Sequence, residues 1–180
     1  MIVQTTYNNI PKGNQAANRL TAVLLILYLM VLGWILLLKF GVQFSYMENR
    51  RVNLIPFNNG NVSVTEMIMN IVIFVPLGIY TGALFKNWNI GKKLLFIFLT
   101  SLIIEGLQFI MAIGAFDITD LMSNTTGGII GLLVFKAIEK LVNSKVKTQK
   151  FINIIAVAGT VIMIFLLVLL KMNMLPVRYQ

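Results

Sequence analysis

The chain contains no cysteine and no histidine. These absences exclude disulfide bonds, thiolate nucleophiles, Cys/His zinc sites and any catalytic arrangement that needs a histidine base. Charged residues are scarce as well, at 12% of 180 residues, against about 25% in an average soluble domain. Carboxylates, hydroxyls, lysines and arginines would have to carry any chemistry. Oxygen ligands for Mg²⁺ or Ca²⁺ stay open on chemical grounds, but no motif predicts a metal site, and we expect no cofactor.

Hydrophobic residues make up 58% of the chain, and its mean hydropathy is +0.85. This composition predicts an all-α, polytopic membrane helix bundle with no separate soluble domain. About five transmembrane helices are expected. Their predicted ranges are Leu20–Leu38, Val64–Phe85, Leu94–Ile113, Ile118–Ile138 and Phe151–Leu170. The first and last are almost purely apolar and suit anchoring, whereas the middle three carry polar residues.

Basic residues predict the orientation of the bundle. Ten lysines and arginines fall on one side of the predicted spans and five on the other, and the richer side is expected to be cytoplasmic. The N-terminus is then inside. The predicted organisation is a cytoplasmic tail (1–19), an anchor (20–38), a core (39–140) that comprises an outer loop (39–63) and three membrane helices, and a last section (141–180). That section holds a cytoplasmic loop, the fifth helix and a short outer tail.

Polar side chains fall on shared faces of the middle three spans. The third span carries Ser101, Glu105 and Gln108, the fourth carries Asp117, Asp120 and Asn124, and the second carries Asn70. Their spacings place the members of each helix on one stripe. A tight turn near Ala115 predicts antiparallel packing, with Glu105 level with Asn124 roughly 14 Å below the turn. Gln108 and Asp120 would lie above them, and all these residues except Ser101 form a candidate polar pocket that opens outward.

Each of these residues also has a structural explanation. Asp117 can cap the following helix, and Gln108 and Asn124 can join helices by hydrogen bonds worth about 0.6–2 kcal/mol each. An intramembrane carboxylate such as Glu105 costs about 2.5–3.5 kcal/mol and is a functional hypothesis by default. Arg50 and Arg51 break the charge rule on the outer side, so they are candidate partners for that carboxylate or for an anion.

Glycines continue the fourth span inward. Gly127 and Gly131 form a small-xxx-small pattern, and Gly128 lies between them. Such glycines let a neighbouring helix backbone approach closely. We therefore expect them to serve helix packing.

These motifs, taken in order, resemble the VanZ family of small integral membrane proteins. The matching segments are NLIPF at 53–57, Asn70 with FVPLG at 74–78, IEGLQ at 104–108, FDITD at 116–120, Asn124 and Gly127-Gly128. The resemblance covers roughly residues 50–135. Many members carry an arginine just before the Phe-Asp-Ile segment, where this chain has Gly114, so Arg50 or Arg51 would have to take its place.

The family is named for a member associated with teicoplanin resistance. The resemblance thus implies a bacterial cytoplasmic-membrane protein that lowers sensitivity to such lipoglycopeptides. We expect it to bind an amphiphile, either the drug or a lipid-linked cell-wall precursor, among membrane lipids and without nucleic acid. Phe109 and Phe116 would line the apolar tail of that ligand.

Two alternatives stay open. The first is a membrane enzyme that modifies a lipid-linked envelope precursor, with Glu105 as acid or base and Asp120 as its partner. The second is a structural scaffold that binds other membrane proteins through its glycine-bearing face.

The predicted orientation can be tested with single introduced cysteines, because the chain has none of its own. In intact cells, Ala115→Cys should react with a membrane-impermeant maleimide, whereas Lys147→Cys should react only after the membrane is opened. Labelling of Ala115→Cys from the cytoplasmic side alone would overturn the outward-facing pocket.

Overall fold

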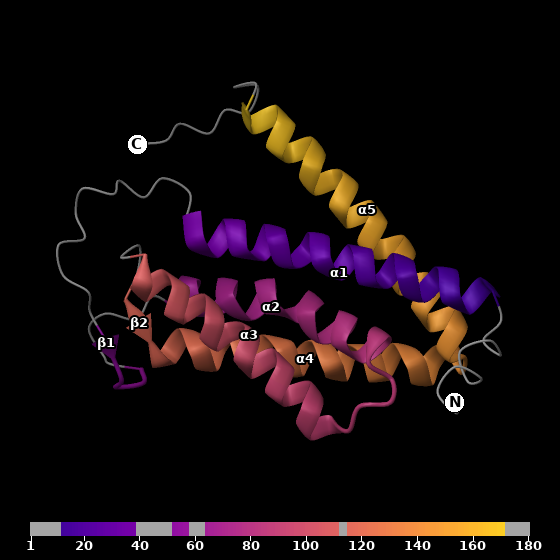
Figure 1. The fold of residues 1–180 in the computed structure, drawn as a ribbon, viewed down its shortest axis with the longest axis horizontal. Helices are drawn as coiled ribbons and strands as arrows, with labels where there is room; N and C mark the ends of the chain where they lie inside the picture. The colour runs from indigo at the N-terminus through magenta and orange to yellow at the C-terminus, as the bar shows by residue number, and fades with distance from the viewer. Residues whose placement is uncertain (1–11, 39–51, 58–63, 112–114, 172–180) are drawn as a thin grey trace, which may run out of the picture. The chain divides into compact units, whose positions relative to one another are not determined.

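A computed structural model describes residues 12–38, 52–57, 64–111 and 115–171 of the chain. These residues form five helices and two short strands (Figure 1): α1 (Lys12–Leu38), β1 (Val52–Asn53), α2 (Val64–Leu84), α3 (Ile90–Ile110), β2 (Phe116–Asp117), α4 (Ile118–Val142) and α5 (Lys145–Lys171). The all-α class predicted from composition is confirmed. Arg50, Arg51, Gly114 and most of the predicted outer loop lie outside the described residues.

The chain divides into two compact units. The larger runs from Leu25 to Ile138 and holds the end of α1, both strands, α2, α3 and most of α4. The smaller comprises residues 1–24 and 139–180, and its described part holds the start of α1, the end of α4 and α5. All of the candidate pocket residues belong to the larger unit.

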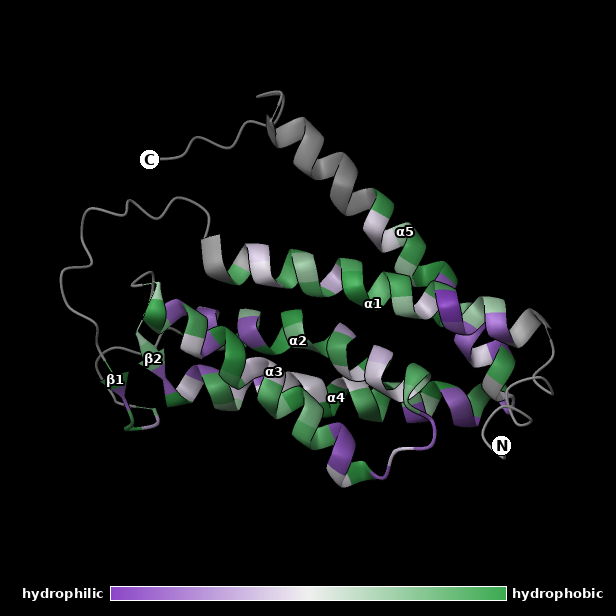
Figure 2. Ribbon diagram, viewed as in Figure 1, coloured by the Kyte–Doolittle hydropathy of each residue, from purple (hydrophilic) through white to green (hydrophobic). Residues whose placement is uncertain are grey.

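Among the residues that the structure describes, four helices are long and apolar enough to cross a membrane. They are α2, α3, α4 and the Gln15–Trp34 part of α1. Figure 2 shows hydrophobic residues along the helices, with hydrophilic ones gathered toward helix ends and around β2. Large side chains such as Val72, Ile103 and Leu133 are exposed on the surface, as expected of side chains that face lipid. The protein is therefore a membrane protein. The fifth predicted span lies within α5, whose helical structure is confirmed, and its crossing of the membrane stays a prediction.

Two helices begin earlier than the hydropathy predicts. Helix α1 starts at Lys12 rather than Leu20, and α5 starts at Lys145 rather than Phe151. Hydropathy detects only the part of a helix that suits lipid, whereas backbone hydrogen bonds continue through the polar residues before it. Only Asn143 and Ser144 separate α4 from α5. Asn143 has a φ of 51°, in the left-handed region where asparagine and glycine commonly end a helix.

Helices α2 and α4 run in parallel, with their backbones in contact. A Cβ added at Gly127 would strike the Ile71 carbonyl oxygen, and one added at Gly131 would strike that of Val75. Gly78 on α2 lies equally close to the backbone of α4. The predicted packing role of the glycines is thus what the structure shows, because any side chain at these positions would separate the helices.

Helix α1 is joined to α2 by a tyrosine. The Tyr28 hydroxyl donates to the Ile73 carbonyl oxygen at 2.6 Å, and its ring centroid lies 5.7 Å from that of Tyr80. Pro76 has no N–H, so the carbonyl that it leaves without a helical donor is that of Val72, the residue before the acceptor of Tyr28.

The glycine contact predicts opposite effects for two matched substitutions. In Gly131→Ala the new methyl group would lie 2.9 Å from the Gly78 Cα as well as against Val75, and overpacking of this kind costs about 1–3 kcal/mol. In Gly106→Ala it would meet nothing within 4 Å, and alanine is favoured over glycine in a helix by about 0.5–1 kcal/mol. The thermal unfolding midpoint in detergent should fall for Gly131→Ala and hold or rise for Gly106→Ala. Equal midpoints would contradict the packing described.

Candidate functional site

A two-residue parallel ladder anchors the segment after the predicted outer arginines. Val52 pairs with Phe116 and Asn53 with Asp117. The Asn53 Nδ2 donates to the Asp117 Oδ2 at 2.9 Å. These strands were not predicted from the sequence, because two residues are too few to show the alternation by which a strand is recognised. The ladder joins two of the segments that carry the family resemblance.

The same segment also contacts α4. The Phe57 N–H donates to the Thr119 Oγ1 at 3.2 Å, and Phe57 has a φ of 56°. This left-handed conformation is strained for a bulky residue. Thr119 is buried, at 1% exposed, and was not singled out from the sequence. The sequence feature that could have identified Thr119 was its position beside two acids in the Phe116–Asp120 motif.

Asp117 uses both carboxylate oxygens to hold local structure. Besides the bond from Asn53, its Oδ1 accepts the Thr119 N–H at 2.7 Å, immediately before the first turn of α4. A carboxylate here satisfies a free backbone donor and suits the positive end of the helix dipole. Of the two explanations considered from the sequence, capping thus accounts for the contacts of Asp117.

Glu105 is buried in the bundle, at 2% exposed. Its Oε2 accepts the Asp117 N–H at 3.4 Å. The carboxylate therefore reaches the strand that leads into α4. The predicted alignment of Glu105 with Asn124 is wrong by about one helical turn.

The packing of α3 on α4 shows why. The Ile97 side chain covers Gly128, since a Cβ there would lie 3.1 Å from the Ile97 Cδ1. One turn further along these antiparallel helices, Ser101 comes level with Asn124, and the next turn brings Glu105 level with Asp120. The prediction assumed a helical rise of about 1.5 Å per residue throughout. Phe116 and Asp117 are extended instead and advance about 3.3 Å each, so α4 lies about 3.6 Å deeper than predicted, which accounts for about two thirds of the one-turn difference.

Gln108 makes a hydrogen bond with α1. Its Nε2 donates to the Leu36 carbonyl oxygen at 2.8 Å, and the side chain is buried against α1. This contact with α1 was not predicted from the sequence. Gln108 thus joins α3 to α1 by a hydrogen bond, which agrees with the structural explanation of this residue.

Asn70 lies beside the acids, as the sequence predicts. Its Nδ2 donates to the Asp120 Oδ1 at 2.8 Å, which connects the second turn of α2 to the first turn of α4. Both side chains are half-buried. Asp120 thus accepts a hydrogen bond from α2, and on α4 it lies level with Glu105.

Two buried polar atoms near the acids lack hydrogen-bond partners. The Ser101 Oγ and the Asn124 Oδ1 belong to side chains that are 0% and 1% exposed, and neither atom is paired among the described residues. An unsatisfied buried polar group costs about 1–3 kcal/mol. Counting helical turns from the contact between Ile97 and Gly128 puts Ser101 and Asn124 at one level, so a single polar group that reached both atoms would satisfy both.

Glu105, Asp120, Asn70, Ser101 and Asn124 together form what we call the inner polar cluster. Within the described part of the chain, no three acidic residues come close enough together to hold a metal ion. The cluster offers carboxylate and amide oxygens, an amide N–H and a hydroxyl. These groups can bind a polyhydroxylated or amide-bearing ligand. The predicted partnership of Arg50 or Arg51 with Glu105 lies outside the described residues.

Comparison with known proteins agrees with the motifs. Residues 25–143 match the family described as VanZ/LLP1, a range that includes every segment quoted for the resemblance. The chain is 39% identical to Protein VanZ of Enterococcus faecium over 150 residues, which is 81% of this chain and 89% of that protein. No solved structure matches the sequence. The chain belongs to the VanZ/LLP1 family.

Proposed function

We propose that this protein lowers the sensitivity of a bacterial cell to teicoplanin-type glycopeptides from within the cytoplasmic membrane. It does so without catalysis, by binding an amphiphile at the inner polar cluster. The observation that carries the proposal is the pair of unsatisfied buried atoms, the Ser101 Oγ and the Asn124 Oδ1, one turn from the buried carboxylate of Glu105. Membership of the VanZ/LLP1 family supplies the link to resistance.

A purely structural role explains these residues poorly. Glu105 lies in a helix that has the length and hydropathy of a membrane span, where ionisable residues usually face a cavity or a partner. Apolar residues at positions 101 and 124 would avoid the cost of unpaired atoms. Ligand binding removes that cost, because the ligand supplies the missing partner for each atom.

The surroundings of the cluster favour an amphiphile over a small polar solute. Apolar side chains that are more than half exposed lie nearby on α2 and beside β1, among them Ile68, Met69 and Leu54. A ligand with a polar headgroup and an acyl tail would satisfy the cluster and cover this apolar surface. Teicoplanin-type drugs and lipid-linked wall precursors both have this construction.

One observation favours an alternative function, in which the protein is an enzyme that acts on such a lipid. The helix register brings Glu105 and Asp120 to one level, and paired carboxylates can work as acid and base. Against this role, one oxygen of Asp120 already accepts a hydrogen bond from Asn70. The scaffold alternative loses support, since Gly127, Gly128 and Gly131 are buried against α2 and α3 and offer no face to a partner.

Drug susceptibility tests the proposal directly. Cells that make the wild-type chain should survive several-fold more teicoplanin than cells without it, and Glu105→Gln and Asp120→Asn should lose most of this protection. Glu66→Gln, an exposed acid on α2, is the matched control and should protect. Vancomycin is tested in parallel, at equal membrane levels of each variant. Undiminished protection by Glu105→Gln would remove the cluster from the function, and no protection by the wild type would reject the function itself.

A second substitution separates ligand binding from structural support. Asn124→Leu removes the unpaired Oδ1 and replaces it by an apolar side chain, so the thermal midpoint in detergent should hold or rise while protection is lost. Ser101→Ala should likewise keep its thermal midpoint and lose protection.

Titration of the nanodisc-embedded chain with teicoplanin then distinguishes a binding protein from an enzyme. A binder loses affinity in Glu105→Gln, whereas an enzyme keeps it. A fall in the thermal midpoint of Asn124→Leu would show that the amide has a structural partner.

A further inference from the structure

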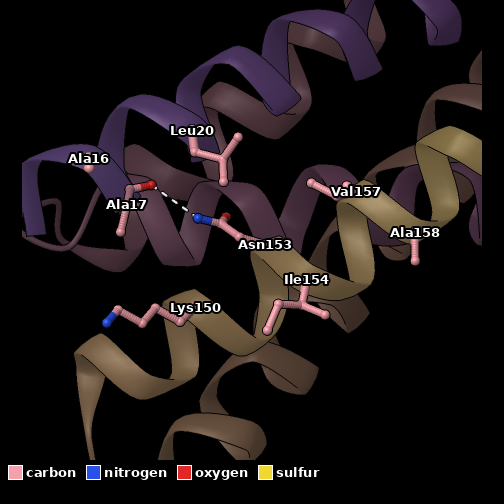
Figure 3. Close-up of a pocket in the computed structure, with 8 residues that line it drawn as sticks. All are labelled: Ala16, Ala17, Leu20, Lys150, Asn153, Ile154, Val157 and Ala158. Atoms are coloured by element: carbon pink, nitrogen blue, oxygen red, sulfur yellow. Dashed lines mark hydrogen bonds between the residues drawn. The ribbon is translucent and has the colours of Figure 1, made fainter. Parts of the chain in front are cut away.

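The smaller unit contains a groove between α1 and α5. Its volume is about 670 Å³, within the range typical of small-molecule sites. Ala16, Ala17 and Leu20 line it from α1, and Ile154, Val157 and Ala158 line it from α5. Figure 3 shows Lys150 toward the end where Ala16 and Ala17 lie, with Val157 and Ala158 toward the other end.

The polar side chains beneath the groove are already hydrogen-bonded to one another. The Asn153 Nδ2 donates to the Ala17 carbonyl oxygen at 3.1 Å, and the Thr21 hydroxyl donates to the Asn153 Oδ1 at 2.9 Å. The Gln149 Nε2 donates to the Thr21 Oγ1 at 2.9 Å. Asn153 is only 3% exposed. The groove therefore presents mainly hydrocarbon along its length and one cation, the Lys150 ammonium.

The charge around the groove is almost entirely positive. Among residues 12–24 and 139–161 the sequence places six lysines and arginines and a single acid, Glu139. Arg19 and Lys147 are exposed, as is Lys150. No further charged residue follows Lys150 until Lys171. Lys150 thus marks where α5 passes from headgroup depth to hydrocarbon depth, and basic residues at that depth attract anionic lipid.

The dimensions suit one leaflet of a bilayer. From Lys150 to Ala158 the helix rises about 12 Å, close to half of the roughly 30 Å hydrocarbon core. An acyl chain that begins at headgroup depth beside Lys150 would run past Ile154 and reach Val157 and Ala158 within its own leaflet.

We propose that this groove is a binding site for one anionic phospholipid. An acyl chain lies along Leu20, Ile154 and Val157, and the phosphate pairs with the Lys150 ammonium. The lipid covers the small side chains at Ala16 and Ala158, which would otherwise leave an open hollow on a surface that faces lipid. This site is independent of the inner polar cluster, which belongs to the other unit.

Native mass spectrometry of the full chain in detergent tests the site, with phosphatidylglycerol and phosphatidylcholine of the same acyl chains added in equal amounts. The wild type should retain phosphatidylglycerol in excess. Lys150→Gln should lower the ratio of bound phosphatidylglycerol to phosphatidylcholine about fivefold, as expected for the loss of one headgroup lysine. Lys136→Gln, an exposed lysine of α4 in the larger unit, should leave the ratio unchanged.

A groove-filling variant completes the experiment. Ala158→Trp should reduce binding of both lipids, because the indole occupies the path of the acyl chain. Thermal midpoints are measured alongside, and Lys150→Gln should match the wild type because the side chain is exposed. Equal retention of the two lipids by the wild type would overturn the proposal, as would an equal effect of Lys150→Gln and Lys136→Gln. Lipid-free dimers that disappear in Ala158→Trp would assign the groove to a second copy of the chain instead.

Discussion

The contact between α2 and α4 is the constraint on which the larger unit depends. Lipid gives little hydrophobic reason for helices to associate, so close van der Waals packing has to hold them together. The glycines at 127 and 131 allow that packing on one side, and Gly78 allows it on the other. The same contact brings the start of α2 beside the start of α4. Asn70 can thereby reach Asp120, and the polar residues meet at one end of the bundle.

The sequence predicted the membrane class and the membrane-spanning parts of the helices well, because hydropathy reads directly which residues tolerate lipid. It predicted helix ends less well. Lys12 and Lys145 begin helices outside the apolar stretches, and nothing in hydropathy distinguishes a solvated helical turn from a loop. The glycine pattern and the shared stripe of Ser101, Glu105 and Gln108 were readable, since both depend only on helical periodicity.

Four residues of the inner polar cluster were named in the predicted pocket, but Ser101 was left out of it and the register was not predicted. Asn70 lies beside Asp120, but Glu105 meets the Asp117 backbone, and the extended residues Phe116 and Asp117 account for about two thirds of a helical turn of that shift. Gln108 lies on the predicted stripe yet turns to the Leu36 carbonyl. A single stripe can face two neighbours, and sequence spacing does not say which. The ladder that joins Asn53 to Asp117 could not be read from two residues either.

The parallel arrangement of α2 and α4 also has a consequence for how the protein is made. Asn70 and its acceptor on Asp120 are 50 residues apart in the sequence. At 5–20 residues per second, synthesis takes roughly 3–10 s to pass from one to the other. The same interval separates the arrival of the two helices at the membrane, so α2 enters the bilayer before the helix that its glycine surface fits. The amide of Asn70 must find water or headgroups until α4 arrives, and its position only two turns from the start of α2 keeps it near both.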